Sequence, residues 1–406
     1  MSGKKPSFMK KMLQENEKKR SVIADKLQGE SYLYAGDPSL QWGTGGWARS
    51  HMNLVYGPSK SGKSTILLMA AGKEQAKSGG VVVIFDSEWG YGDIHETDLT
   101  GEYTIRAKKT RDRLKKANIS LDDVVIWQTN IGTDLFSYLS DIEDDLKKDP
   151  NCVCSIIVDS WGGIQPEQAR NKLEKGQSDD AGKSFGGNAK TINPLVQQLL
   201  RISNTYGVTV YGVQHVMVNQ SEYGPKFLLP GGQKMIHLHE TILFVEGLET
   251  KNKALLEGEV SGTSTDDTSL KIGKMVNFRC EKSRATVEGK TGCFYMNFRD
   301  MKFAQPAQSL FDLAVRLGVV VHPIKDDGKE SIAWWQFPAK AATPLKWNGQ
   351  ANAVTALGED KDLFNKVYED CLTSSKMHAI DRNELTPVEV DGAEVSSIVS
   401  EGKKGA

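Results

Sequence analysis

The stretch that decides the fold is Gly57-Pro58-Ser59-Lys60-Ser61-Gly62-Lys63-Ser64, which fits the spacing G-x-x-x-x-G-K-[ST] of a phosphate-binding loop. An apolar run at residues 52–56 precedes the loop, and a helical pattern over about residues 63–77 follows it. Glycines let such a loop wrap closely around phosphates, while successive backbone N–H groups and the helix N-terminus face the anion. The stretch, extended by Thr65, therefore predicts an ATP site in which Lys63 reaches the β- and γ-phosphates and Ser64 holds Mg²⁺.

The bulk composition limits the classes of protein that remain open. The chain has 406 residues, which predicts two or three domains, and a formal net charge of −1. A near-neutral chain has no general attraction for polyanions, so any DNA site must come from local clusters of charge. Five cysteines without a Cys-x-x-Cys pattern predict reduced thiols in a cytoplasmic protein. No apolar run fits a signal peptide or a membrane span, so we expect no membrane partner.

Buried strands alternate with helices along the first half of the chain. Apolar runs at residues 81–85, 124–127, 154–158 and 208–213 are separated by helical patterns, which favours an α/β fold with a mostly parallel, twisted central sheet. The later runs at residues 241–245, 275–280 and 293–297 have no long helices between them, so one edge of the sheet is expected to become antiparallel. A helix over residues 307–317 and a hairpin over residues 319–337 are expected to follow.

Two carboxylates stand where such a sheet would place them beside the phosphates. Asp159 ends the third apolar run and is expected to act on Mg²⁺ through a bound water. Glu88 follows the second run in Phe85-Asp86-Ser87-Glu88. A strand parallel to the one before the loop would bring Glu88 near the γ-phosphate, where it can orient the attacking water as a general base. His215, at the end of the fourth run, is a candidate sensor of the γ-phosphate.

The order of these motifs resembles that of RecA-type recombinases. The matching features are the phosphate-binding loop, the strand ending in Asp-Ser-Glu, Ile157-Val158-Asp159-Ser160, the strand ending in Gln214-His215 and the following Gly231-Gly232. The loop, Glu281-Lys282-Ser283-Arg284 and residues 313–320 look most like the tailed-phage branch, the UvsX recombinases. The similarity spans roughly residues 40 to 340, and His215 falls where many relatives have glutamine.

This resemblance implies a DNA-dependent ATPase that forms helical filaments on single-stranded DNA and exchanges strands with a homologous duplex. ATP would lie between adjacent subunits, with Glu88 as the catalytic base and with Lys282 and Arg284 reaching the ATP of the neighbour. A recombination mediator and a single-strand-binding protein would be partners. The protein would work in the cytoplasm, that of a bacterial host if it is phage-encoded.

Two polar stretches fit the two DNA-binding loops that the resemblance implies, at about residues 162–190 and 217–235. Lysines and arginines would neutralise phosphates there, and aromatic rings would stack on bases. The candidates are Arg170, Lys172, Lys175 and Lys183 in the first loop, and Tyr223, Lys226, Phe227 and Lys234 in the second. Composition alone leaves open that both loops are simply solvated.

The expected domain plan has four parts. Residues 1–40 would form an N-terminal helix or arm for subunit contact, residues 41–303 the RecA-like ATPase core, residues 304–380 a small C-terminal α+β domain, and residues 381–406 a disordered tail. Two other functions remain open. A hexameric DNA helicase or motor of the same fold usually carries a large N-terminal domain, for which about fifty residues before the loop leave little room. A nucleotide-gated DNA-binding paralogue without turnover would have no need of Glu88.

Overall fold

The structure is a computed structural model that describes residues 31–92, 97, 105–167, 185–219, 227–230, 233–248, 254–256, 271–325, 328–338 and 344–374. The chain divides into two units, Met1–Ser31 and Tyr32–Ala406, and every element below belongs to the second. Among the helices of these described residues, none is long and apolar enough to cross a membrane.

A ten-stranded sheet forms the centre of the described fold. Its strands are β3 (Met52–Gly57), β4 (Val81–Asp86), β5 (Val124–Gln128), β6 (Val153–Asp159), β7 (Thr209–His215), β10 (Thr241–Gly247), β11 (Ala254–Leu256), β12 (Lys271–Lys282), β13 (Thr291–Asn297) and β14 (Lys302–Ala304). They lie in the order β14-β13-β12-β10-β3-β7-β6-β4-β5, with β11 beside β12. The strands from β10 to β5 are parallel, whereas β12 to β14 are antiparallel. The α/β fold expected from the sequence is thus confirmed.

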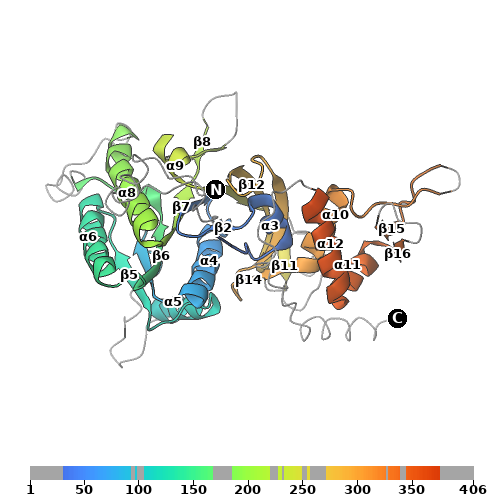
Figure 1. Cartoon of the computed structure of the whole chain (residues 1–406), viewed down its shortest axis with the longest axis horizontal. Coiled ribbons are helices and arrows are strands. Elements are labelled where there is room, and N and C mark those ends of the chain that lie inside the picture. The colour runs from blue at the N-terminus through green and yellow to red at the C-terminus, as the bar shows by residue number, and fades with distance from the viewer. Residues whose placement is uncertain are drawn as a thin grey trace, which may run out of the picture. The chain divides into compact units, whose positions relative to one another are not determined.

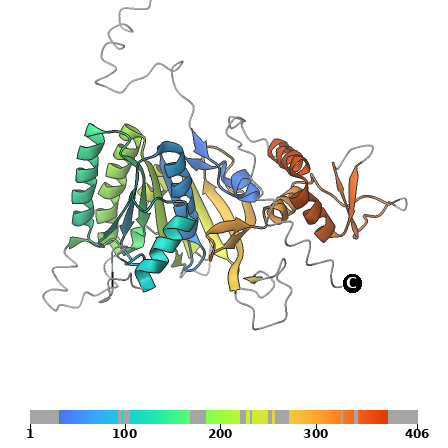
Figure 2. The ribbon, with the colours of Figure 1, turned by 90° about the horizontal axis from the view of Figure 1, so that it is seen from below.

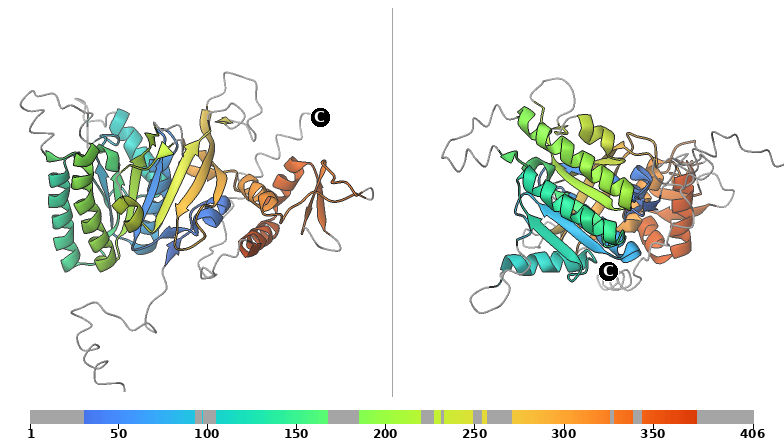
Figure 3. Two further views of the ribbon diagram at one scale, coloured as in Figure 1. Left: turned by 90° about the horizontal axis from the view of Figure 1, so that it is seen from above. Right: turned by 60° about the vertical axis from the view of Figure 1, so that its left-hand side comes forward.

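Helices cover the two faces of the parallel part of the sheet, as Figure 2 shows. On one face α4 (Lys63–Ser78) and α5 (Ile105–Lys116) contribute to an apolar core with residues such as Leu67 and Leu114. On the other face α6 (Gly132–Lys148) and α8 (Phe185–Tyr206) lie side by side (Figure 3). Because both faces are covered, the parallel strands are apolar almost throughout, and all seven residues of β6 are buried.

The parallel register brings four distant positions to one edge of the sheet. Gly57 at the end of β3 pairs with His215 at the end of β7, and Asp86 at the end of β4 pairs with Asp159 at the end of β6. The ligand sites of open α/β sheets lie outside the carboxyl ends of the strands. This edge is therefore where a functional site is expected.

The C-terminal elements form a core of their own (Figure 1). Helices α10 (Pro306–Arg316), α11 (Gln350–Glu359) and α12 (Lys361–Ser374) pack together with the hairpin of β15 (Trp334–Phe337) and β16 (Leu345–Asn348). Helix α3 (Pro38–Thr44) contacts α10 and adds Trp42 to this core. The sequence predicts a hairpin over residues 319–337, whereas the observed hairpin of β15 and β16 lies later in the chain, between Trp334 and Asn348. Pro323 has no N–H for a ladder, and the strand preceding β15 is reduced to two isolated bridges, at Val321 and Ile324.

Glu74, in the second half of α4, forms an ion pair with Arg49, which precedes β3, and a hydrogen bond with Thr209 at the start of β7. The carboxylate of Glu74 accepts hydrogen bonds from Arg49, Ser78 and Thr209, and its side chain is only 3% exposed. Removing Arg49 leaves the buried carboxylate of Glu74 without its charged partner, so we expect Arg49→Ala to lower the free energy of unfolding by about 3–5 kcal/mol. Urea denaturation measures this. Lys147→Ala, which breaks an exposed pair with Asp144, is the matched control and should have little effect.

A second stability prediction concerns Asp37, which caps α3 and is fully buried. Burial raises the pKa of this carboxyl to about 7, although the N–H groups of Ser39 and Leu40 donate to it. The folded state therefore holds a proton that the unfolded state releases, and stability falls as pH rises from about 4 to about 7. Asp37→Asn keeps a capping side chain without a charge. Relative to wild type, it should gain roughly 2–3 kcal/mol between pH 5 and pH 8 in urea denaturation. Parallel pH profiles would contradict this assignment.

Candidate active site

The phosphate-binding loop connects β3 to α4 in a conformation that only glycine permits at two points. A Cβ at Gly57 would lie 2.0 Å from the carbonyl oxygen of Val245, so the chain approaches too closely for any side chain. Gly62 has a φ of 91°, and a Cβ there would also meet the ring of Phe298. The loop thus opens into the N-terminus of α4, where unpaired N–H groups favour an anion.

Lys63, the first residue of α4, lies curled against the loop. Its ammonium donates to the carbonyl oxygens of Gly57 at 2.9 Å and of Pro58 at 2.7 Å. Burial lowers the pKa of Lys63 to about 8, while Asp159 and Glu88 oppose this shift. Because the ammonium of Lys63 interacts electrostatically with the carboxylates of Asp159 and Glu88, the three predicted side chains lie close together.

Glu88, just after β4, is held by two partners. Its Oε1 lies 2.9 Å from Nε2 of His215 and also accepts a hydrogen bond from the hydroxyl of Ser160. The contact with His215 is the largest cause that lowers the pKa of Glu88. The carboxylate is therefore ionised at neutral pH, and its side chain remains 41% exposed at the edge of the sheet. An ionised carboxylate with one accessible side has the properties that a general base requires.

Asp159 lies deeper than Glu88, at the end of β6. Burial raises the pKa of Asp159, whereas the hydroxyls of Ser64 and Tyr91 donate to it and lower the pKa. The hydroxyl of Ser64 and the carboxylate of Asp159 thus meet at the start of α4. Oxygen atoms of these two kinds are the ligands that Mg²⁺ prefers, and a cation would offset the burial of the carboxylate. The residues present therefore fit the magnesium ion predicted from the sequence.

These side chains line one cavity of about 450 Å³. Its wall contains Ser59 to Thr65 of the loop and helix, Glu88, Asp159 and His215, and in addition Arg113, Val213 and Phe298. Arg113 of α5 lies over the ring of Tyr91 at 5.3 Å, and Phe298 lies against Gly62. No role was predicted from the sequence for Arg113, Ser160 or Phe298. Ser160 was quoted only as part of Ile157-Val158-Asp159-Ser160, and its hydroxyl, adjacent to Asp159, was a signal for a role beside Glu88.

Lys282 and Arg284 do not join this cavity. Lys282 ends β12 and pairs with Ile242 near the start of β10, at the edge of the sheet opposite the loop. Its ammonium donates to the carbonyl oxygens of Ile236 and His237, and Arg284 forms an ion pair with Glu240 at 2.8 Å. Within the described residues of one chain, these two cations therefore bind other groups than its own phosphate site.

Most of the DNA-binding candidates lie outside the described residues: Arg170, Lys172, Lys175, Lys183, Tyr223 and Lys226. Helix α8 begins at Phe185, inside the range expected for the first loop. Phe227 is in the short strand β9 (Phe227–Leu228), which pairs with β8 (Met217–Val218), and its ring lies 6.1 Å from that of Phe244. Lys234 is exposed in α9 (Gln233–Leu238).

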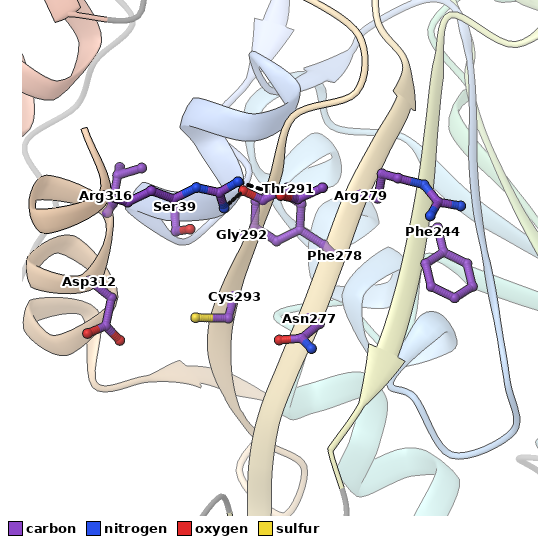
Figure 4. Close-up of a pocket in the computed structure, with 11 residues that line it drawn as sticks. Ser39, Phe244, Asn277, Phe278, Arg279, Thr291, Gly292, Cys293, Asp312 and Arg316 are labelled. Carbon is purple, nitrogen blue, oxygen red and sulfur yellow. Dashed lines mark hydrogen bonds between the residues drawn. The ribbon is translucent and has the colours of Figure 1, made fainter. Parts of the chain in front are cut away.

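A second cavity, of about 420 Å³, lies between the antiparallel strands and α10 (Figure 4). Its arginines already have partners, since Arg316 donates to Thr291 and Arg279 pairs with Glu281. None of the residues predicted to carry chemistry lines it. The cavity at the carboxyl ends of the parallel strands is therefore the stronger candidate.

Comparison with known proteins gives one consistent result. No family model matches the chain. Protein RecA of Mesomycoplasma hyopneumoniae is 21% identical over 91% of this chain and 95% of its own length. Protein RecA of Chloroherpeton thalassium is 24% identical over 82% and 78%, and that of Lactococcus lactis subsp. cremoris is 23% identical over 80% and 70%. The chain is thus a distant relative of RecA proteins along most of its length, which supports the RecA-type resemblance of its motifs.

Proposed function

We propose that this protein is an ATPase of the RecA type that assembles on single-stranded DNA and uses ATP to control that assembly. It would pair the bound strand with a homologous duplex and exchange strands. The observation that carries the proposal is the ionised carboxylate of Glu88, held at 2.9 Å by His215 in the same cavity as Lys63 and Asp159. A protein that only binds a nucleotide has no need of such a base.

The mechanism follows from the roles that these side chains can take. The loop N–H groups and Lys63 bind the phosphates, with Lys63 leaving the carbonyl oxygens of Gly57 and Pro58. Ser64 and Asp159 would hold Mg²⁺, and the ion would supply positive charge that offsets the charge of the phosphates. Glu88 accepts a proton from the attacking water once His215 no longer occupies that side of the carboxylate.

His215, which must move away from Glu88 in this mechanism, connects the cavity to the segment that follows β7. His215 ends β7, and β8 begins only two residues later, at Met217. Gln214 adds a second link, because its amide nitrogen lies 3.4 Å from the carbonyl oxygen of Pro230, after β9. A change at His215 on nucleotide binding would therefore be passed to the β8–β9 ribbon, which frames the second proposed DNA loop.

We also propose a branch of the RecA-type recombinases for this chain. The residues quoted from the loop, Glu281-Lys282-Ser283-Arg284 and residues 313–320 resemble those of the tailed-phage UvsX recombinases, and this resemblance supports membership of that branch. On that basis we propose roles in phage recombination, repair and recombination-dependent replication, in the cytoplasm of a bacterial host. A mediator and a single-strand-binding protein would be its partners. Residues 1–40 would provide the subunit contact, and the domain limits at 41–303 and 304–380 are proposed with it.

Binding to single-stranded DNA tests the proposal and its charge model together. With a non-hydrolysable ATP analogue we expect binding that weakens with salt, with a log–log slope of about −0.7 for each phosphate neutralised. Fluorescence anisotropy of a labelled oligonucleotide over a salt series measures the slope, and negative-stain imaging shows the form of the complex. Closed rings of six subunits, in place of filaments, would favour a hexameric motor. Salt-insensitive binding would contradict the phosphate contacts.

A further inference from the structure

The turn that carries Glu88 closes around a buried carboxyl group. Asp86, the last residue of β4, is only 1% exposed. Its Oδ1 accepts a hydrogen bond from the N–H of Gly90 at 2.9 Å, and its Oδ2 accepts one from the N–H of Tyr91, also at 2.9 Å. The side-chain amide of Gln128 donates to the same Oδ2 at 3.0 Å. Asp86 therefore folds the chain back immediately after Glu88.

The first part of the same turn is attached to the end of β6. The N–H of Ser87 donates to the carbonyl oxygen of Asp159 at 3.0 Å. The hydroxyl of Ser87 donates to the carbonyl oxygen of Ser160 at 2.6 Å and accepts from the N–H of Ser160 at 2.9 Å. Between the two attachments, Trp89 has a φ of 57°, which a residue other than glycine keeps only where the surrounding contacts hold it. The backbone is therefore fixed on both sides of Glu88.

Tyr91 extends from this turn to the second carboxylate of the cavity. The residue is buried, and its hydroxyl donates to Oδ2 of Asp159 at 3.0 Å. Helix α5 covers it, because the hydroxyl of Thr110 donates to the carbonyl oxygen of Tyr91 and the guanidinium of Arg113 lies over the ring. The phenol is thus held at its backbone, ring and hydroxyl. Because a hydroxyl carries no charge, it can orient Asp159 without replacing a cation at the carboxylate.

We propose that Tyr91 is a positioning residue that fixes Asp159 relative to Glu88. This inference rests on the proposed function, because it assumes a nucleotide and Mg²⁺ in the cavity. The hydroxyl of Tyr91 holds the acid assigned to the ion, and its N–H, bound to Asp86, closes the turn that holds the base. Hydrogen-bond partners behind a metal-binding carboxylate set its direction, and their loss typically lowers metal affinity by about 10- to 100-fold.

Tyr91→Phe removes the hydroxyl and keeps both the ring and the backbone N–H. Binding of a fluorescent ATP analogue to the full chain is measured without DNA, over a series of free Mg²⁺ concentrations. The Mg²⁺ concentration at half-maximal effect should rise about tenfold. The affinity in the presence of EDTA should stay that of wild type, because the phosphate-binding loop is intact. A purely structural role would change both quantities or neither.

Tyr211→Phe is the matched control for the loss of this hydroxyl. Tyr211 is a buried residue of β7, and its hydroxyl has no hydrogen-bond partner among the described residues. The Mg²⁺ midpoint of this variant should equal that of wild type. If Tyr91→Phe also has the wild-type midpoint, even with a lower stability in urea, the inference is overturned.

Asp86→Asn tests the turn itself. A carboxamide has one oxygen, so it can accept from the N–H of Gly90 or of Tyr91 but not from both through separate oxygens. We expect the Mg²⁺ midpoint to rise as in Tyr91→Phe. In addition, ATP hydrolysis at saturating Mg²⁺ should fall by about 10- to 100-fold, because a misplaced base loses its alignment with water. Tyr91→Phe, which keeps the turn, should recover most of the wild-type rate at that Mg²⁺ concentration.

Asp122→Asn, at an exposed position before β5, is the control for this second variant and should change neither quantity. A wild-type rate in folded Asp86→Asn would overturn the role of the turn, and Tyr91→Phe alone decides the proposal if Asp86→Asn does not fold. Because the binding measurements contain no DNA, they are independent of the DNA response. If DNA did not change hydrolysis, the proposed function would fail while the Mg²⁺ midpoint still decided the role of Tyr91. A wild type that does not bind the analogue would overturn both.

Discussion

Glu88→Gln is expected to lower the rate of ATP hydrolysis by about 10²- to 10⁴-fold, because a general base contributes a factor of that size. Glutamine has nearly the same shape and can still accept a hydrogen bond from Ser160, but it does not accept a proton from water at neutral pH. The fold and the phosphate-binding loop should remain intact. Steady-state phosphate release measures the rate, and binding of a fluorescent ATP analogue shows that the cavity is still occupied.

Glu359→Gln, at the end of α11 and away from the cavity, is the matched control for this loss of a carboxylate. Its rate should equal that of wild type. Because hydrolysis would be blocked while binding persists, the Glu88 variant should also hold the assembled state longer on DNA. If Glu88→Gln hydrolysed ATP at the wild-type rate, Glu88 would not be the general base. The nucleotide-gated DNA-binding paralogue would then be the better interpretation.

Lys63→Ala is expected to weaken ATP binding by about 10- to 100-fold and to lower the rate of hydrolysis by about 10²- to 10³-fold. The ammonium meets charge that grows on the phosphates in the transition state, so the rate should suffer more than the affinity. Lys77→Ala, at the far end of the same helix, is the control and should leave both quantities unchanged.

The pKa of Lys63 gives this second prediction a distinctive pH dependence. Burial lowers that pKa to about 8 in the free protein, and phosphates would raise it in the complex. Binding above pH 8 therefore takes up a proton, so the affinity of wild type should fall by about fivefold from pH 8 to 9. The affinity of Lys63→Ala should change far less over that range. Equal pH profiles for the two proteins would show that Lys63 does not contact the phosphates.

The parallel sheet is the reason that so much of the site was predictable. Glu88, Asp159 and His215 each follow an apolar run in the sequence, and the carboxyl ends of parallel strands meet at one edge. The structure brings all three to the cavity that Lys63 borders. The antiparallel edge was predictable for a related reason, since residues 241–297 contain strands without long helices between them.

Contacts that depend on side-chain packing across the chain were not predictable. Arg113 lies in α5, and Phe298 follows β13. No pattern in the sequence indicates that both side chains line the same cavity as the phosphate-binding loop. Likewise, Lys282 binds backbone carbonyls of α9, and a carbonyl carries no sequence signal. The burial of Asp37 was not predictable either, because its position between α3 and α10 depends on residues far along the chain.

The most direct test of the account is the rate of ATP hydrolysis by the full chain with and without single-stranded DNA. We expect DNA to increase the rate by at least about tenfold, because the proposed assembly completes the cavity and moves His215 away from Glu88. The increase should disappear in Glu88→Gln. A rate that is the same with and without single-stranded DNA, at nucleotide concentrations that saturate the site, would contradict the central claim that this cavity is a DNA-controlled ATPase.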